Sequence, residues 1–279
     1  MAQIRDISNY KILEKVGKGA FGSVFRAHIK DKAGNISVAA FKCINLEDAE
    51  DDLEDIQKEV AMLATVSCPQ LTQYYGSLIQ GTELILAMEF MEGGSLSDLM
   101  KILDTTCDES LIKYITLHLC LGLKYLHGER KIHRDVKGAN VLLSSAGAVK
   151  LADFGVAIQL TDTMTRRRTF VGSPYWMAPE IILSESYNES ADIWSLGITV
   201  IELALGKPPL HTVHPMKAIF QIPKGPAPTL PDGPLPSGET PSPELRAFLS
   251  ACLRKTPADR ADTEALLEHP FLAGVDEDF

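Results

Sequence analysis

The sequence predicts an α+β fold in which a small β-rich lobe precedes a larger, mainly helical lobe. Short β-prone runs, separated by turn residues, fill positions 10–90. From position 95 onward, apolar residues recur at the spacing of a helix instead. Strands followed by helices, rather than alternating with them, are typical of α+β proteins. We expect the link between the two lobes near residues 92–94.

The composition limits the class of protein and its partners. The chain has 279 residues, of which 45% are hydrophobic and 23% charged, as in ordinary globular proteins of one large domain or two lobes. A net charge of −10 disfavours binding to nucleic acid or anionic membranes. The longest apolar stretch, 193–205, is too short to span a membrane. The N-terminus lacks the apolar core of a secretion signal, and five widely spaced cysteines without a CxxC pair favour a reducing compartment. We therefore expect a cytoplasmic protein.

The elements follow in order along the chain. Strands are expected at 10–16, 24–29, 37–44 and 84–90, and one helix is expected between them, because apolar residues at 53, 56, 60 and 63 recur at helical spacing in an acidic stretch. The apolar stripe at 111, 115, 119, 123 and 126 predicts a long helix that stops at Gly128. Residues 193–205 are apolar nearly all round, as in a buried helix, and Gly206 ends them. Residues 224–243 hold seven of the sixteen prolines, which predicts an extended loop rather than packed structure.

A glycine-rich segment is the first motif that carries chemistry. It comprises Gly17, Lys18, Gly19, Ala20, Phe21, Gly22, Ser23 and Val24. Glycines allow backbone N–H groups to approach a phosphate closely. A strand, not a helix, is expected after the last glycine, so a flap over ATP phosphates fits better than a dinucleotide-binding loop. Taken alone, the motif is also compatible with an ordinary hairpin turn.

The second motif is a lysine on the third expected strand. Lys42 follows Ala40 and Phe41, and a strand lysine acts on phosphates only where a carboxylate holds it in place. Glu59, at the edge of the apolar face of the acidic helix, is the candidate partner. The alternative is a solvated lysine and one more acid on an exposed helix face.

The third motif, residues 133–140, is more specific. Asp135 can accept a hydroxyl proton, and Asn140, five residues later, can hold a divalent metal. Lys137 can neutralise charge on a transferred phosphoryl group. Asp153, before Phe154 and Gly155, adds a carboxylate that suits a metal at the end of a strand.

The last motif, residues 169–180, closes the loop that Asp153 opens. Thr169 follows three arginines. A phosphate on Thr169 would add about −1.5 to −2 charge and would order the loop against Arg134. Without the flanking motifs, an unmodified surface threonine would be the simpler interpretation.

These motifs, in this order and spacing, resemble those of the eukaryotic protein kinases over about residues 10–272. The resemblance implies a single kinase domain over 1–279. Its small lobe, 10–91, would hold five strands and one helix; the helical lobe would span 92–272 and a tail 273–279. Lys137 is typical of serine/threonine kinases. Residues 46–60, 160–163, 169–180 and 214–217 are similar to the germinal-centre branch of the sterile-twenty kinases, with its third subgroup the most similar.

The resemblance also implies ATP, Mg²⁺ and protein substrates. The residues that it places around the nucleotide base are Val16, Val24, Ala40, Met88, Glu89, Met91 and Leu143. Glu89 and Met91 would bond adenine through their backbone, and the apolar positions could equally serve as core. Asn140 and Asp153 would hold Mg²⁺, Thr169 would be the activating phosphosite and Arg134 its receiver. A helical-repeat scaffold that binds the small lobe near the acidic helix would fit the family, and no oligomeric state follows from the sequence.

Several positions depart from the family pattern. Ala39 and Phe41 flank Lys42 where valine and isoleucine are more usual, so Phe41 must find extra room. Ser173 replaces a threonine, and Ala261 follows Arg260 where proline is common. An inactive scaffold is disfavoured because Lys42 and the other catalytic positions are retained, and a small-molecule phosphotransferase is disfavoured by the segment 169–180.

Overall fold

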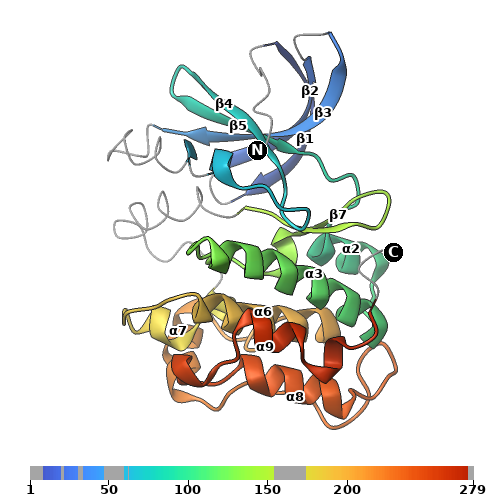
Figure 1. Ribbon diagram of the computed structural model, residues 1–279, viewed down its shortest axis with the longest axis vertical. Coiled ribbons are helices and arrows are strands. Elements are labelled where there is room, and N and C mark those ends of the chain that lie inside the picture. The colour runs from blue at the N-terminus through green and yellow to red at the C-terminus, as the bar shows by residue number, and fades with distance from the viewer. Residues whose placement is uncertain are drawn as a thin grey trace. The chain divides into compact units, whose positions relative to one another are not determined.

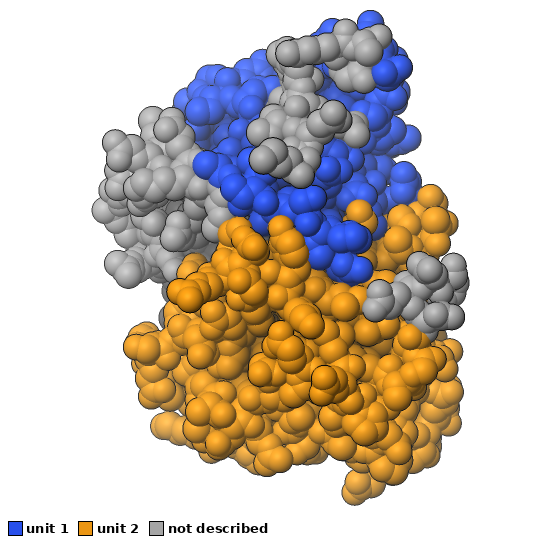
Figure 2. All heavy atoms as spheres, in the orientation of Figure 1, with its two compact units in different colours: residues 1–92, 153–172 blue, residues 93–152, 173–279 orange. Residues whose placement is uncertain are grey.

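The computed structural model describes residues 9–19, 22–30, 34–46, 60–61, 63–153 and 174–275. The chain divides into two compact units, one comprising residues 1–92 and 153–172 and the other residues 93–152 and 173–279 (Figure 2). Asp153 thus groups with the first unit, although in the sequence it directly follows the segment 93–152 of the second unit. No helix among the described residues is long and apolar enough to cross a membrane.

The first unit contains a five-stranded antiparallel sheet with the order β1-β2-β3-β5-β4 (Figure 1). Its strands are β1 (Tyr10–Gly19), β2 (Gly22–Lys30), β3 (Ile36–Asn45), β4 (Tyr74–Gln80) and β5 (Glu83–Glu89). The five strands that the family resemblance implied are therefore present. The β-prone runs alone gave four and missed β4, whose register is interrupted next to a glycine, a residue depleted in strands.

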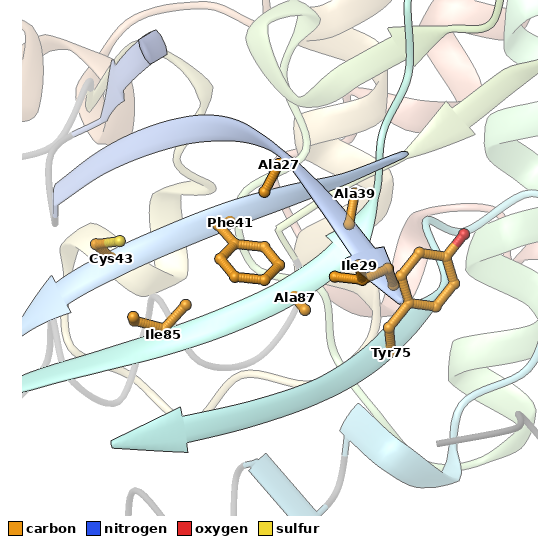
Figure 3. Close-up of a cluster of buried hydrophobic side chains, with 8 residues drawn as sticks. All are labelled: Ala27, Ile29, Ala39, Phe41, Cys43, Tyr75, Ile85 and Ala87. Carbon is orange, nitrogen blue, oxygen red and sulfur yellow. The ribbon is translucent and has the colours of Figure 1, made fainter. Parts of the chain in front are cut away.

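The core of this unit lies on one face of the sheet (Figure 3). Its buried members are Ala27, Ile29, Ala39, Phe41, Cys43, Tyr75, Ile85 and Ala87. Phe41 is fully buried and lies opposite Ala87 across the β3–β5 ladder, and its ring centroid is 4.9 Å from that of Tyr10. Alanines at 27, 39 and 87 leave the space that the larger ring occupies. These small side chains provide the extra room that Phe41 needs where the family more often has isoleucine.

The expected acidic helix is described only at its end. Residues 60, 61 and 63–65 are helical, and Leu63 is buried as the apolar pattern predicts. Glu59, the candidate partner of Lys42, lies outside the described residues.

The second unit is mainly helical, as predicted. Its elements are β6 (Gly94–Ser95), α2 (Leu96–Leu103), α3 (Glu109–Gly128), the 3-10 turn η1 (Gly138–Asn140), β7 (Val141–Leu143), β8 (Val149–Leu151), η2 (Pro174–Trp176), α5 (Pro179–Ile182), α6 (Ser190–Leu205), α7 (Pro215–Lys224), α8 (Pro243–Cys252), η3 (Pro257–Asp259), α9 (Thr263–Leu267) and η4 (Pro270–Leu272). Strands β6, β7 and β8 form a small antiparallel sheet. Helix α3 packs against α6 and α9 (Figure 1).

Helix α3 begins where Asp108 accepts a hydrogen bond from the N–H of Leu111, and it ends at Gly128 as predicted. The predicted stripe was wrong at its first member. Leu111 is 39% exposed, whereas Ile112 is fully buried. The buried face runs 112, 115, 119, 123 and 126, so in the first turn the core side lies one residue later than the leucine pattern suggested.

Helix α6 is buried on almost every side, as its apolar sequence predicts, and Gly206 ends it in a left-handed conformation with φ of 76°. Four polar residues of this helix are also buried: Asp192, Ser195, Thr199 and Glu202. Their spacing of three, four and three residues places them along one face of the helix. We call this face the polar stripe of α6.

The proline-rich stretch has no helix or strand between Gly225 and Ser242, as expected, but the prediction that it is not packed was wrong. Leu230 and Leu235 are buried, and Arg246 Nη1 donates to the carbonyl of Leu230 at 3.0 Å. The first part of the stretch also lines an apolar cavity of about 820 Å³ together with α6 and α7. Two leucines within the prolines provide enough apolar surface to hold the loop against the helices.

Candidate active site

The glycine-rich segment forms the hairpin of β1 and β2. Gly17 lies opposite Val24, Lys18 opposite Ser23 and Gly19 opposite Gly22, so the predicted order of strand, glycine turn and strand is confirmed. Ala20 and Phe21, at the tip, lie outside the described residues. A Cβ atom at Gly22 would lie 1.8 Å from the carbonyl oxygen of Cys43, so the hairpin can pack on β3 only with glycine at this position.

Lys42 projects from the face of β3 opposite to Phe41, because successive residues of a strand point to opposite sides. Lys42 Nζ lies 2.9 Å from Asp153 Oδ1, and the lysine side chain is only 11% exposed. Asp153 adopts a left-handed backbone conformation with φ of 63°, which is uncommon outside glycine. Two residues that the sequence predicted to act on phosphates and metal are therefore in contact within the first unit.

Three of the predicted base-binding residues, Val24, Ala40 and Met88, share the face of Lys42. Ala40 lies opposite Met88 across the β3–β5 ladder, and Val24 lies opposite Lys42 across the β2–β3 ladder. All three apolar side chains are half-buried, whereas Val16 on β1 is 45% exposed. The face thus combines one lysine with apolar surface.

At the end of β5, the N–H of Glu89 donates to the carbonyl of Gln73 at 2.7 Å, and Glu89 Oε2 accepts from the N–H of Gln73 at 3.0 Å. The amide and side chain of Glu89 therefore fix the strand end, and its bond to adenine through the backbone stays a prediction. Met91, two residues later, is buried. Leu143, the remaining residue of the predicted base pocket, belongs to β7 of the second unit.

Asp135 is oriented by two neighbours in the second unit. Lys137 Nζ donates to both carboxylate oxygens of Asp135, at 2.8 and 2.7 Å. Asn140 Nδ2 donates to Asp135 Oδ2 and to its backbone carbonyl, both at 2.8 Å. The three residues that the third motif singled out thus form one hydrogen-bonded cluster.

The loop that carries Asp135 is held by the carboxylate of Asp192, which is fully buried in α6. Asp192 accepts from the backbone N–H groups of His133 and Arg134, both at 2.7 Å, and its Oδ2 lies 2.9 Å from His127 Nε2. A charged acceptor with several hydrogen bonds can be buried in this way, whereas an unpaired one could not.

His133 connects this loop to the segment that leads to Asp153. Its Nδ1 accepts from the N–H of Asp135 at 3.2 Å, so Nε2 carries the proton and donates to the carbonyl of Ala152 at 3.0 Å. The N–H of Ala152 in turn donates to the carbonyl of Asn140 at 2.8 Å. The residue before Asp153 is therefore bonded twice to the loop of Asp135.

Arg134 occupies a left-handed conformation with φ of 70°. Its Nε atom is buried without a hydrogen-bond partner among the described residues, and its guanidinium carbon lies 5.6 Å from the ring centroid of Tyr187. Thr169, the predicted phosphosite, and Ser173 lie outside the described residues.

The segment that follows Ser173 is anchored to the body of the second unit. Arg260 donates to both carboxylate oxygens of Glu180, with 2.7 Å between Nη2 and Oε2. Ser195 Oγ donates to the carbonyl of Trp176 at 2.8 Å, and Tyr175 Oη donates to the carbonyl of Val213 at 2.8 Å.

Sequence reasoning missed the function of the polar stripe of α6. Thr199 Oγ1 shares its hydrogen between the carbonyls of Ser195 at 2.8 Å and Val136 at 3.3 Å, and Glu202 accepts from the N–H of Gly138 at 2.9 Å. With Asp192, these residues hold the loop at four points. The signal was present in the sequence as polar residues spaced three to four apart in an otherwise apolar helix.

The donor set of the predicted metal site fits Mg²⁺, which prefers oxygen ligands. Asn140 uses Nδ2 for both bonds to Asp135, so its amide oxygen takes no part in them. Asp153 supplies a carboxylate. Each residue belongs to a different unit.

The first unit carries a buried lysine, Lys42, on a five-stranded sheet, and the helical unit carries a loop with Asp135, Lys137 and Asn140. This combination is typical of a protein kinase. The family model of the protein kinase domain matches residues 10–272, and the chain belongs to this family.

Two relatives extend the comparison. The chain is 46% identical over 264 residues to serine/threonine-protein kinase dst1 of Dictyostelium discoideum, covering 94% of this chain and 34% of that protein. It is 48% identical over 266 residues to serine/threonine-protein kinase sid1 of Schizosaccharomyces pombe, covering 95% of this chain and 54% of that protein. These matches confirm the resemblance to serine/threonine kinases of the sterile-twenty and germinal-centre family. The chain spans about a third and about half of the relatives' length, and its placement in the third subgroup stays a prediction.

Proposed function

We propose that this chain is an active serine/threonine protein kinase, which transfers the γ-phosphoryl group of ATP to hydroxyl groups of protein substrates. The observation that carries the proposal is the cluster of Asp135, Lys137 and Asn140, in which a carboxylate is oriented by a lysine and an amide. The identity of 46% and 48% to two serine/threonine-protein kinases supports the same assignment.

Asp135 would accept the proton of the substrate hydroxyl as its oxygen forms the new bond to the γ-phosphorus and the bond to the β-phosphate oxygen breaks. Lys137, at 2.7 Å from the Asp135 carboxylate, would place positive charge beside the transferred group. The bond from Asn140 Nδ2 to Asp135 Oδ2, together with the two bonds from Lys137, keeps the carboxylate from rotating. The cluster contributes by positioning and by electrostatics rather than by covalent chemistry.

Lys42 would hold the phosphates of ATP from the first unit, with Asp153 beside it. Mg²⁺, when bound, supplies charge neutralisation at the phosphate oxygens. Asn140 and Asp153 are the residues that would hold it. The apolar face around Ala40 and Met88 would receive the adenine, and the backbone N–H groups of the hairpin from Gly17 to Gly22 would cover the phosphates.

Several finer properties belong to the same proposal. We propose that phosphorylation of Thr169 activates the enzyme and that Arg134, whose buried Nε has no hydrogen-bond partner within the described part of the chain, receives the phosphate. The family resemblance and the cysteine pattern support an intracellular signalling kinase. A helical-repeat scaffold at the small lobe would bind near the acidic stretch 46–60, which lies mostly outside the described residues.

The test is transfer of labelled phosphate from ATP and Mg²⁺ to a generic basic protein, with the modified sites mapped by mass spectrometry. Asp135→Asn should lower kcat by about 10²- to 10⁴-fold, because the variant loses the proton acceptor. Binding of ATP should stay within about twofold, since Asp135 acts in the transition state. Equal turnover in wild type and variant would refute the mechanism. An absence of phosphoserine and phosphothreonine, even after treatment with an upstream kinase, would refute the function.

Thr169→Ala tests the proposed switch separately. The variant should resist activation by an upstream kinase, while the wild type gains activity as Thr169 is modified. Full activity of Thr169→Ala would refute the switch without affecting the proposed reaction.

A further inference from the structure

Glu202 is a buried carboxylate on the polar stripe of α6, with only 4% of its surface exposed. We propose that Glu202 is a positioning residue for phosphoryl transfer, which locks the Asp135 loop to the segment of Trp176 through a three-donor junction. This inference rests on the proposed kinase function. It assigns a role to a residue that the sequence motifs did not include.

The junction is defined by three hydrogen bonds from three different elements. Glu202 Oε1 accepts from Ser97 Oγ of α2 at 2.8 Å. Glu202 Oε2 accepts from the N–H of Gly138 in η1 at 2.9 Å and from Nε1 of Trp176 in η2, also at 2.9 Å. One carboxylate oxygen is thus shared by the catalytic loop and by the segment that follows Ser173.

The N–H of Gly138 requires an acceptor from outside its own turn. Gly138 is the first residue of η1, and the first N–H groups of a helical turn have no partner within the turn. The preceding residue, Lys137, cannot cap the turn with its side chain, because an ammonium group has no hydrogen-bond acceptor. Glu202 therefore supplies from α6 the cap that a serine or aspartate would normally supply locally.

The close approach also explains the glycine at this position. A Cβ atom on residue 138 would lie 2.7 Å from Ser97 Oγ and 3.0 Å from Glu202 Oε1. Any larger residue would have to push the carboxylate away from the N–H that it caps. Gly138 and Glu202 thus form one unit, and either can be changed to disturb it.

The position of η1 matters because it lies between the two residues that orient Asp135. Lys137 directly precedes Gly138, and Asn140 closes the same turn. A shift of the Gly138 N–H therefore moves both donors to the Asp135 carboxylate. Misplacement by about 1 Å can cost a factor of about 10² in rate.

Trp176 extends the junction to the proposed substrate side. Its carbonyl accepts from Ser195 Oγ and its indole N–H donates to Glu202, so α6 holds this residue at both ends. Because the indole and the Gly138 N–H share one oxygen, a change in the orientation of Glu202 is transmitted to both segments.

Two substitutions separate positioning from simple burial of charge. Glu202→Gln can preserve the junction, because its amide oxygen can accept from Gly138 and Trp176 while its NH₂ group donates to Ser97 Oγ. Glu202→Met has a similar shape but no acceptor for either N–H. Thr116→Val is the matched control, since it removes a buried hydroxyl that, among the described residues, donates within α3 to the carbonyl of Ile112.

The experiment measures kcat, the KM for protein substrate, the dissociation constant of ATP and the thermal midpoint of each variant. We expect Glu202→Met to lower kcat by about 100-fold, with ATP affinity within twofold of wild type. Glu202→Gln should retain kcat within about fivefold, and Thr116→Val should match wild type in kcat. If Glu202→Met does not fold, Gly138→Ala provides the second disturbance of the junction and should lower kcat by at least tenfold.

Four outcomes decide the matter. Loss of kcat in Glu202→Met or Gly138→Ala, with rescue in Glu202→Gln, supports positioning through hydrogen bonds. Wild-type kcat in folded Glu202→Met overturns the inference but leaves the kinase function intact. Equal loss in Glu202→Gln and Glu202→Met also overturns it, because then the charge and not the hydrogen bonding is required. A wild-type chain that transfers no phosphate refutes the proposed function, and this inference with it.

Discussion

Replacing Arg260 by methionine should remove several kcal/mol of stability from the second unit. The side chains of Arg260 and Glu180 are 0% and 2% exposed. Besides its two bonds to Glu180, the guanidinium donates to the carbonyls of Arg254 at 2.8 Å and Ser190 at 3.0 Å. The substitution leaves the Glu180 carboxylate buried without its cation, and it removes the donor from both carbonyls.

Removal of one partner from a buried ion pair costs about 3–5 kcal/mol, mainly because the remaining charge is desolvated and unpaired. In a domain of this size, 1 kcal/mol corresponds to about 2–4 °C in the midpoint of unfolding. We therefore expect Arg260→Met to lower the midpoint by about 6–20 °C. Arg260 also lies 5.2 Å from the ring centroid of Trp194, a contact that the methionine side chain replaces only in part.

The assay is thermal unfolding followed by intrinsic fluorescence, because buried Trp194 is one of only two tryptophans in the chain. Lys101→Met is the matched control: Lys101 pairs with Asp98 at 3.3 Å, but these side chains are 76% and 69% exposed. Its midpoint should shift by no more than about 1–2 °C, since exposed pairs contribute about 0–1 kcal/mol.

A double variant, Glu180→Met with Arg260→Met, should recover part of the loss, because it leaves no unpaired charge. A midpoint for Arg260→Met within 2 °C of wild type would refute the reasoning. It would mean that Glu180 finds solvent or another donor when its partner is removed.

Three further predictions concern other parts of the chain. Phe41→Ala should destabilise the first unit by about 3–5 kcal/mol in urea unfolding, because Phe41 is fully buried among small residues, and a cost below 1 kcal/mol would show that the sheet collapses into the space. Burial lowers the pKa of His269, so the unfolded chain binds a proton more readily than the folded one, and stability should be lost as pH falls below about 6.5. His269→Asn, which keeps an acceptor for the Phe271 N–H, should flatten this dependence of stability on pH. An unchanged pH profile in the variant would contradict the argument. Burial, and secondarily Asp108, raises the pKa of Cys107 to about 11, so alkylation at pH 8, mapped by mass spectrometry, should modify the partly exposed Cys68 well before Cys107, and the reverse order would contradict the burial argument.

The catalytic cluster could be predicted from the sequence because its members are close along the chain. Asp135, Lys137 and Asn140 span six positions, so one loop and one 3-10 turn bring them together. The long helices were predictable for a similar reason, since α3 and α6 carry continuous apolar patterns. In addition, Asp108 caps the start of α3 and Gly206 ends α6.

What could not be predicted depends on contacts between distant segments. Asp192 bonds Arg134 across 58 positions, and no local pattern names the partner of a buried carboxylate. The prolines of residues 224–243 predicted an extended loop that is not packed, whereas Leu230 within this stretch is buried. Strand β4 was missed because a glycine and a register irregularity weaken its pattern, although its pairing with β5 makes it a full member of the sheet.

The polar stripe of α6 also determines how the loop of Asp135 opens. Surface loops usually exchange their amide hydrogens quickly, since their N–H groups face water. Here the amides of His133, Arg134 and Gly138 donate to carboxylates that are 0% and 4% exposed inside the helical unit. Deuterium can reach these amides only when the surroundings of α6 open, so we expect them to exchange as slowly as the helix itself. The loop that would perform the reaction is then as resistant to local opening as the core of its unit.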